Sequence, residues 1–304
     1  MRSSLLPTIV LATATVAASS QTQPPRYYNP RFSADSTRVI FESTREGKMA
    51  VFAINADGTG LRKLTDGKQD DAQPQWSPLG DLITFTSNAT PGALNKVFVM
   101  RSDGSNRKQI SIGPKHDAAP SFSTDGRLVA WAANTELPEN WRDVGVASAD
   151  GNVEPRLITS GPGNDQAPVW ISSSRLVFVR EFPPKTDWRA MSPEDHAKRR
   201  ASSEIMGINA DGSGLTQLTT NEAFDSEVSW AGALKRIFFA TTRNGSSELF
   251  SMNADGTDAR RMADFTGSVS SDGRFVTYAK IIDGRSGIFV RALAGGAERE
   301  LIGG

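Results

Sequence analysis

The chain has 304 residues, 38% of them hydrophobic and 22% charged, a composition typical of a globular protein rather than a disordered one. Lys and Arg together number 34, as do Asp and Glu, so no net charge favours nucleic acid or an acidic membrane surface as a partner. Cys is absent, which excludes disulfides, thiolate metal sites, a cysteine nucleophile and a lipid-modified cysteine.

The N-terminal segment predicts export. Arg2 precedes an uncharged apolar stretch from Leu5 to Ala18, and small residues follow, as in a secretory signal peptide cleaved near Ala18. A membrane anchor is the alternative, but a span needs about 20 apolar residues and this run is shorter. We therefore expect a signal peptide over residues 1–18, a linker over 19–26 and a soluble mature chain without a membrane segment. It would be periplasmic in a Gram-negative cell and secreted otherwise.

An internal repeat dominates the rest of the chain. The stretch "INADGTGLRKLT" at Ile54–Thr65 returns as "INADGSGLTQLT" at Ile208–Thr219, and a divergent copy, "MNADGTDARRMA", begins at Met252. Each repeat unit opens with a Pro-x-aromatic-Ser segment or a variant of it, followed by a β-branched and aromatic run typical of a strand, such as "RVIFES" or "LITFTS". Six such openings occur: "PRFSADS", "PQWSPLG", "PSFSTDG", "PVWISSS", "VSWAGAL" and "GSVSSDG".

Each unit continues with a polar loop, an apolar strand ending in Asp-Gly and a fourth strand. The Asp-Gly pair is expected to supply the positive backbone angles of a tight hairpin, and the sixth unit has Ala294-Gly295 instead. Four short antiparallel strands repeated six times predict an all-β, six-bladed β-propeller over residues 27–304. The apolar middle strands fit sheets that are buried on both faces. The sequence leaves two ways for the ring to close. Blades one and six could meet by side-chain packing alone, or residues Gln21 to Asn29 could add an edge strand.

The pattern "PxFSxDGxxVxF…NADGxxxxxLT" resembles the TolB-like repeat, the PD40-type and WD40-like blade of TolB propellers. The resemblance covers Tyr27 to Ile302, and the Gly-His and Trp-Asp dipeptides typical of WD40 repeats are absent. It implies a six-bladed propeller that binds a protein or peptide of the cell envelope. The full TolB protein carries an additional α/β domain before its propeller, for which this sequence has no room.

An acidic position recurs where each innermost strand begins. Because innermost strands line the central channel, these residues are predicted to form a ring at one mouth, where a divalent cation such as Ca²⁺ or a basic group of a partner would offset their repulsion. The alternative is local, since an Asp before a strand often accepts hydrogen bonds from backbone N–H groups. The positions are Asp71, Asp117, Asp165, Asp225 and Asp264, with Tyr27 in the first unit.

The fourth unit carries an insertion, "FPPKTDWRAMSPEDHAKRRA", in which Ser192 and Pro193 predict the start of a short helix. It should lie on the same face as the acidic ring, together with a loop of the third unit. Long insertions in a regular scaffold often carry recognition, whereas the alternatives are a solvated decoration or a latch across the channel. The predicted partner-binding residues are Phe182, Trp188, Lys198, Arg199, Arg200, Trp141 and Arg142.

Catalytic signatures are scarce. His116 and His196 are the only histidines, and a Gly-x-Ser-x-Gly motif is absent. The sequence therefore favours a monomeric, non-catalytic scaffold that binds a protein or peptide, with no cofactor and no nucleic-acid partner. The alternative is a hydrolase or lyase that acts at the channel mouth through Asp carboxylates and a bound divalent cation.

Overall fold

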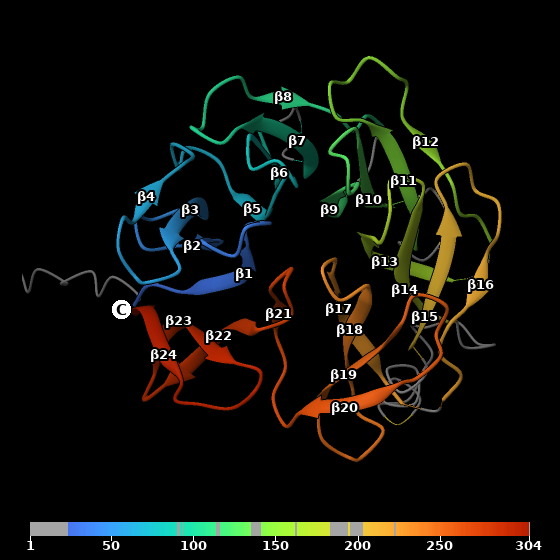
Figure 1. Ribbon diagram of the computed structural model, residues 1–304. Helices are drawn as coiled ribbons and strands as arrows, with labels where there is room; N and C mark the ends of the chain where they lie inside the picture. Colours follow the sequence, from blue (N-terminus) through green and yellow to red (C-terminus); the bar gives the residue numbers. More distant parts are fainter. Residues whose placement is uncertain are drawn as a thin grey trace, which may run out of the picture.

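The computed structural model describes residues 24–89, 92, 94–113, 116–134, 141–161, 163–182, 194, 203–221 and 223–303. Within these ranges, β1 to β24 form six four-stranded antiparallel sheets arranged as a ring around a central channel (Figure 1). The predicted six-bladed propeller is confirmed. The predicted signal peptide lies outside the described residues, and no helix among those described is long and apolar enough to cross a membrane.

Each blade consists of four consecutive strands, the first innermost and the fourth outermost. Blade 1 contains β1 (Tyr27–Phe32), β2 (Arg38–Ser43), β3 (Ala50–Asn55) and β4 (Arg62–Lys63). Blade 2 contains β5 (Asp71–Trp76), β6 (Leu82–Ser87), β7 (Lys96–Arg101) and β8 (Lys108–Gln109). Blade 3 contains β9 (Asp117–Phe122), β10 (Leu128–Asn134), β11 (Arg142–Ser148) and β12 (Arg156–Leu157).

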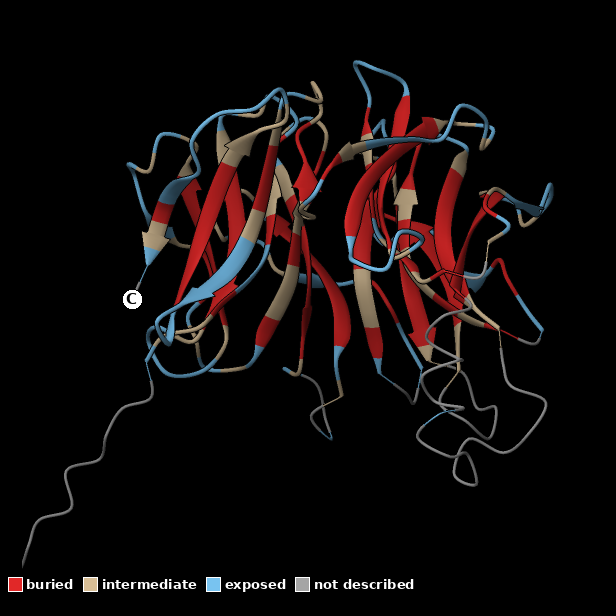
Figure 2. Ribbon diagram, turned by 90° about the horizontal axis from the view of Figure 1, so that it is seen from below, coloured by how far each residue is buried: buried red, intermediate tan, exposed pale blue. Residues whose placement is uncertain are grey.

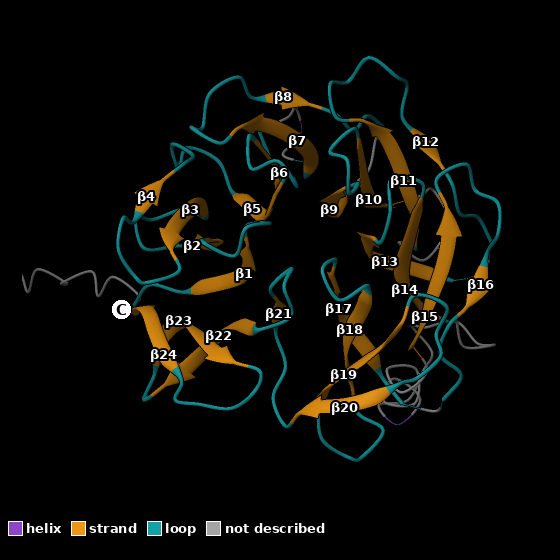
Figure 3. Cartoon of the chain, viewed as in Figure 1, coloured by secondary structure: helices purple, strands orange, loops and turns teal. Residues whose placement is uncertain are grey.

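The second half of the ring repeats this order, and Figure 3 shows that strands and loops make up nearly all of it. Blade 4 contains β13 (Asn164–Trp170), β14 (Arg175–Glu181), β15 (Ser203–Asn209) and β16 (Thr216–Gln217). Blade 5 contains β17 (Asp225–Ala231), β18 (Arg236–Thr241), β19 (Glu248–Asn253) and β20 (Arg260–Ala263). Blade 6 contains β21 (Ser268–Val269), β22 (Phe275–Ile282), β23 (Arg285–Ala292) and β24 (Arg299–Gly303).

In the Asp-Gly hairpins, Asp and Gly have different roles, which the sequence did not predict. Of the Asp57-Gly58 pair between β3 and β4, only Gly58 adopts a positive φ, of 90°, and its N–H donates to the Asn55 carbonyl over 2.8 Å. The Asp57 carboxylate instead accepts hydrogen bonds from the N–H and the hydroxyl of Thr59, at 2.9 and 2.6 Å. The prediction that both residues of the pair take positive angles is therefore wrong, because the Asp side chain holds the turn while Gly provides the backbone angle.

The hydrophobic core lies between the blades. Six clusters of buried side chains each combine residues of two neighbouring blades, so both faces of the middle strands are buried (Figure 2). Burying a large apolar side chain stabilises the fold by about 1.5–3 kcal/mol. The apolar face of a blade is buried only by packing against the neighbouring blade. The stability of each blade therefore depends on the complete ring.

Side-chain packing closes the ring, as the first of the two predicted alternatives has it. Phe41 and Phe52 of blade 1 share a buried cluster with Ile288 and Leu301 of blade 6. The Tyr27 N–H also donates to the Ser286 hydroxyl, 3.1 Å away. The sheet of blade 6 contains only β21–β24, and no strand from the described N-terminal residues joins it.

A candidate binding channel

The recurring acidic residues of blades 2 to 5 are buried at the start of their innermost strands. Asp71, Asp117, Asp165 and Asp225 are each at most 4% exposed, and each forms an ion pair with a Lys or Arg. Tyr27 takes the equivalent buried place in blade 1. Asp264 of blade 6 differs, because it is exposed and precedes the short strand β21.

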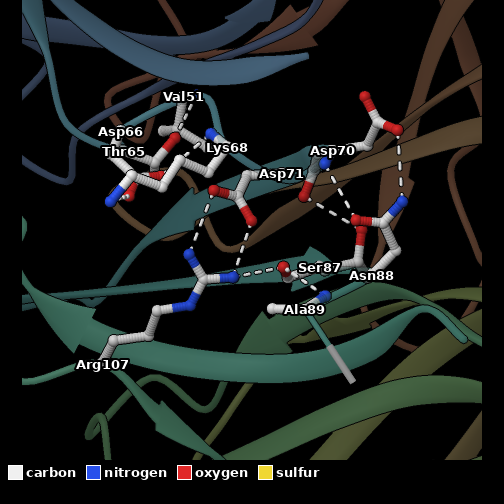
Figure 4. Close-up of polar contacts among 12 residues, drawn as sticks. Val51, Thr65, Asp66, Lys68, Asp70, Asp71, Ser87, Asn88, Ala89 and Arg107 are labelled. Carbon is white, nitrogen blue, oxygen red and sulfur yellow. Dashed lines mark hydrogen bonds and ion pairs between the residues drawn. The ribbon is translucent and has the colours of Figure 1, made fainter. Parts of the chain in front are cut away.

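The cation that meets the acid comes from a different place in each blade. In blade 2, Arg107 binds both oxygens of Asp71, over 2.7 and 3.1 Å, and also donates to the Ser87 hydroxyl (Figure 4). Its guanidinium lies 4.9 and 4.7 Å from the ring centres of Phe85 and Phe98, a cation–π arrangement. The cation of the pair thereby lies against two aromatic rings of its own blade.

In blade 3 the cation comes from the preceding blade. Lys96 of β7 lies 2.9 Å from Asp117, which also accepts a 2.6 Å hydrogen bond from Ser111. Burial raises the pKa of the Asp117 carboxyl, and the contacts with Ser111 and Lys96 oppose the rise. The pair therefore ties blade 2 to blade 3.

Blades 4 and 5 supply the cation from their second strand or the loop after it. Asp165 is bound through both oxygens by Arg180 of β14, and the bond to Asp165 raises the pKa of Arg180. Asp225 lies 3.7 Å from Arg243 and accepts a 2.8 Å hydrogen bond from Asn221.

These pairs change how the acidic positions are understood. The carboxylates of blades 2 to 5 bind side chains of their own or a neighbouring blade, and not mainly backbone N–H groups as the local alternative supposed. The described part of the chain contains no group of three or more His, Asp or Glu side chains that could hold a metal ion. Four of the five acids on which the alternative of a metal-assisted hydrolase or lyase relied are thus already engaged with cations, and Asp264 is the exception.

The predicted partner-binding residues fall into two groups. Trp188, Lys198, Arg199 and Arg200 lie outside the described residues. Phe182 is half-buried and packs against the core between blades 3 and 4. Trp141 is also half-buried, and its neighbour Arg142 reaches Gln166, 3.4 Å away, and lines the central channel.

A repeated bulge shapes the channel wall. The third residue of β1, β5, β9 and β17, and its equivalent in β13, has a positive φ of 47–52°. The pairing with the second strand shifts at the same place in each of these blades. A left-handed backbone costs a non-glycine residue about 1–2 kcal/mol, so the ring must stabilise these bulges. The bulge residues are Asn29, Gln73, Ala119, Ala167 and Glu227, and all of them line the channel.

The channel holds a cavity of about 1000 Å³ that extends from the bulges to the turns between first and second strands. Its wall combines aromatic and apolar groups, including Phe32, Trp76 and Val169, with charged residues. The charged residues are Arg31, Arg142, Glu227 and Lys235. A second cavity of about 450 Å³ lies at the other end, against the starts of β5 and β9, and shares Gln73, Ala118 and Arg142 with the first. The larger space therefore opens toward the Asp-Gly hairpin face, opposite the face that sequence reasoning favoured.

Polar side chains connect the blades around this wall. Glu42 of β2 accepts a 2.9 Å hydrogen bond from the Asn29 amide and another from the N–H of Gln73. Gln73 in turn accepts a 2.8 Å bond from the N–H of Ala119. Burial raises the pKa of the Glu42 carboxyl, and these bonds oppose the rise. The backbone of two bulges is thus fixed by the side chain of the preceding blade.

Sequence reasoning missed the channel-lining residues. The repeat units were aligned by their Pro and aromatic residues. The residues that face the cavity stand on either side of this Pro, or of the Val that replaces it in blade 5, and they differ between blades, as in "NPR", "QPQ" and "EVS". Variation at fixed places within an otherwise regular repeat was the available signal.

The fold and this wall define a six-bladed β-propeller with an open central channel of mixed polar and apolar lining. The chain belongs to the PD40 family, described as the TolB beta propeller domain, whose family model matches residues 7–200, more than half of the chain.

Solved structures agree with this assignment at the level of the fold. The chain is similar to TolB from Acinetobacter baumannii, with a TM-score of 0.65 and 14% identity over 90% of this chain and 62% of that one. It is also similar to a putative TolB from Agrobacterium tumefaciens, with a TM-score of 0.55 and 14% identity over 91% of this chain and 80% of that one. This chain therefore spans less than two thirds of the Acinetobacter protein.

One curated relative is more alike over a short stretch. The uncharacterized protein Atu1656 of Agrobacterium fabrum is 34% identical over 58 residues, which are 19% of this chain and 20% of that protein.

Proposed function

We propose that this propeller is a non-catalytic binding module that holds an extended peptide segment of a partner protein in its central channel. The observation that carries the proposal is the cavity of about 1000 Å³, which lies at the upper end of the range for ligand sites, about 300–1000 Å³. Its wall is built on the rigid inner strands and mixes aromatic, amide and charged side chains, the combination that gives a site both affinity and specificity.

The chemistry of the described residues supports binding over catalysis. His116 is exposed, and its Nδ1 accepts a 3.0 Å hydrogen bond from the N–H of Asn95, so this nitrogen is already used. The buried Asp residues of the inner strands are paired with cations and make poor general bases. A rigid wall with fixed polar groups suits recognition of a peptide by complementarity.

A channel-blocking variant tests the proposal. A displayed library of short linear peptides is selected against the wild-type chain, and the recovered peptides are measured against Ala118→Trp and Val153→Trp. Ala118 lines both cavities, whereas Val153 is exposed on a hairpin outside them. We expect Ala118→Trp to weaken binding at least about tenfold, or about 1.4 kcal/mol, and Val153→Trp to leave it unchanged. Peptides that bind Ala118→Trp as well as wild type would contradict a channel site.

The partner's location and the insertion belong to the same proposal. The apolar N-terminal segment supports export, with a partner in the cell envelope, and fractionation of cells producing the full chain, with and without residues 1–18, tests it. Recovery of both forms in the cytosol would contradict export. The insertion after Phe182 remains a predicted partner-binding segment, which deletion of residues 183–201 in the peptide and partner assays would examine.

A further inference from the structure

The channel wall contains an arginine without a partner. Arg31 of β1 lines the large cavity, and its side chain makes no hydrogen bond or ion pair with any residue that the structure describes. Burial lowers the pKa of its guanidinium, and the charges of Glu227 and Glu42 oppose that shift. An Arg remains charged under all ordinary conditions, so the wall holds a partly desolvated cation that forms no ion pair within the described part of the chain.

Neither neighbouring carboxylate fills this role. Glu42 is 5% exposed and is committed to Asn29 and to the N–H of Gln73. Glu227 lines the same cavity, but no ion pair joins it to Arg31, and its own carboxylate has no partner in the described part of the chain. Two opposite charges thus face one cavity without meeting.

Two glutamines add amide donors to the same cavity wall. Gln75 uses its side-chain oxygen to accept from the N–H of Phe122, 3.0 Å away, and Gln73 uses its oxygen for Ala119. Both glutamines therefore keep an NH₂ group that has no acceptor among the described residues. A wall with a guanidinium and amide donors is complementary to a negatively charged acceptor.

We propose that the peptide held in the channel carries a carboxylate that binds Arg31, and a basic group that faces Glu227. This inference rests on the proposed function and specifies the chemistry of its ligand. The planar guanidinium matches a carboxylate through two parallel hydrogen bonds, which are strong where water is excluded. Glu227 gives the cavity a polarity, because it attracts an ammonium or guanidinium and repels a doubly charged anion such as a phosphate.

The test uses the peptides selected against the wild-type chain. Each acidic side chain is replaced by its amide and, separately, the C-terminus is amidated, so the two sources of a carboxylate are distinguished. Affinities are measured for wild type, Arg31→Gln, Arg31→Lys and the control Arg101→Gln, an exposed residue outside the cavity wall. We expect Arg31→Gln to lower the affinity for the acidic peptide at least about tenfold and Arg31→Lys to lower it less. Arg101→Gln should leave this affinity unchanged. The amide form should bind wild type and Arg31→Gln equally.

Two results would overturn the inference and leave peptide binding intact. One is a set of selected peptides whose carboxylates can be neutralised without loss. The other is a substantial fall in the melting temperature of Arg31→Gln. Removing an Arg that serves only to bind a ligand should leave the stability of the free protein unchanged or raise it, whereas removing a structural Arg should lower it.

A small probe separates failure of the inference from failure of the proposed function. If no peptide is selected, the Arg31 Nε–H resonance is followed by NMR during titration with the singly charged N-acetylglycine and with its neutral amide, N-acetylglycinamide. A shift with the acid alone supports the anion site and leaves only the peptide proposal refuted. No shift with either compound overturns the anion site as well.

Discussion

Asp165 and Arg180 face each other in blade 4 as a closed, two-point ion pair. The Nε–Oδ1 and Nη2–Oδ2 distances are 2.6 and 2.7 Å, and the two side chains are 0% and 10% exposed. The same acid position is met by Arg107 in blade 2 and by Lys96 of the preceding blade in blade 3. Blades 2 to 5 thus share a buried acid at this position, and its cation comes from a different position in each case.

The pair in blade 4 should be important for stability. Asp165→Asn leaves the buried Arg180 without its counter-charge, and we expect the free energy of unfolding to fall by about 3 kcal/mol. Asp264→Asn is the matched control, because this acid of blade 6 is exposed, and it should change stability by less than about 0.5 kcal/mol. Denaturant unfolding of both variants measures this, and equal losses would show that burial of the pair is not the cause.

Blades 1 and 6 meet by side-chain packing and hydrogen bonds without strand pairing among the described residues, so their junction should be sensitive to cavities. Ile288 is fully buried in the cluster shared by these blades, so Ile288→Ala should destabilise the protein by about 2–5 kcal/mol. Ile281 lies in the neighbouring strand β22 and is 61% exposed, so Ile281→Ala should cost far less. Thermal melts compare the two, and a mild effect of Ile288→Ala would argue that this junction contributes little to the cooperative unit.

The bulges of the inner strands predict an unusual response to glycine. Ala167 has a φ of 48°, so Ala167→Gly removes left-handed strain of about 1–2 kcal/mol and loses about 0.5–1 kcal/mol in chain entropy. We expect a net stabilisation of about 0.5 kcal/mol. Ala118→Gly, in β9 without a positive φ, should instead destabilise. A lower unfolding midpoint for Ala167→Gly would show that the bulge is not strained at this residue.

The Asp residues of the Asp-Gly hairpins should contribute to the loss of folding stability at low pH. The hydroxyl of the Ser or Thr two residues on lowers the pKa of Asp57, Asp103, Asp211 and Asp255 below the ordinary 3.8. A pKa that is lower in the folded state gives stability that is present above the unfolded value and lost as the pH falls through the folded value. A variant with all four changed to Asn should therefore lose less melting temperature than wild type between about pH 6 and about pH 3. An unchanged acid dependence would refute this source.

The architecture of this protein could be predicted from its sequence. Strand composition and hairpin residues recur with the repeat, as in Ile54–Thr65 and Ile208–Thr219, and these local signals suffice to set four strands per blade. Continuous apolar runs such as that of β14 could be buried on both faces only by neighbouring blades, so the ring follows from the same pattern.

The partners of the individual polar residues could not be predicted from the sequence, because they depend on how the blades pack together. Lys96 and Asp117 belong to different blades, and Arg107 reaches Asp71 from a position no repeat marks, so their pairing depends on how sheets stack. Likewise, Arg31 and Glu227 are far apart in sequence and belong to blades 1 and 5, yet they line one cavity because every first strand faces the same axis. Spacing along a chain carries local geometry, whereas a site made by several blades exists only once the ring has closed.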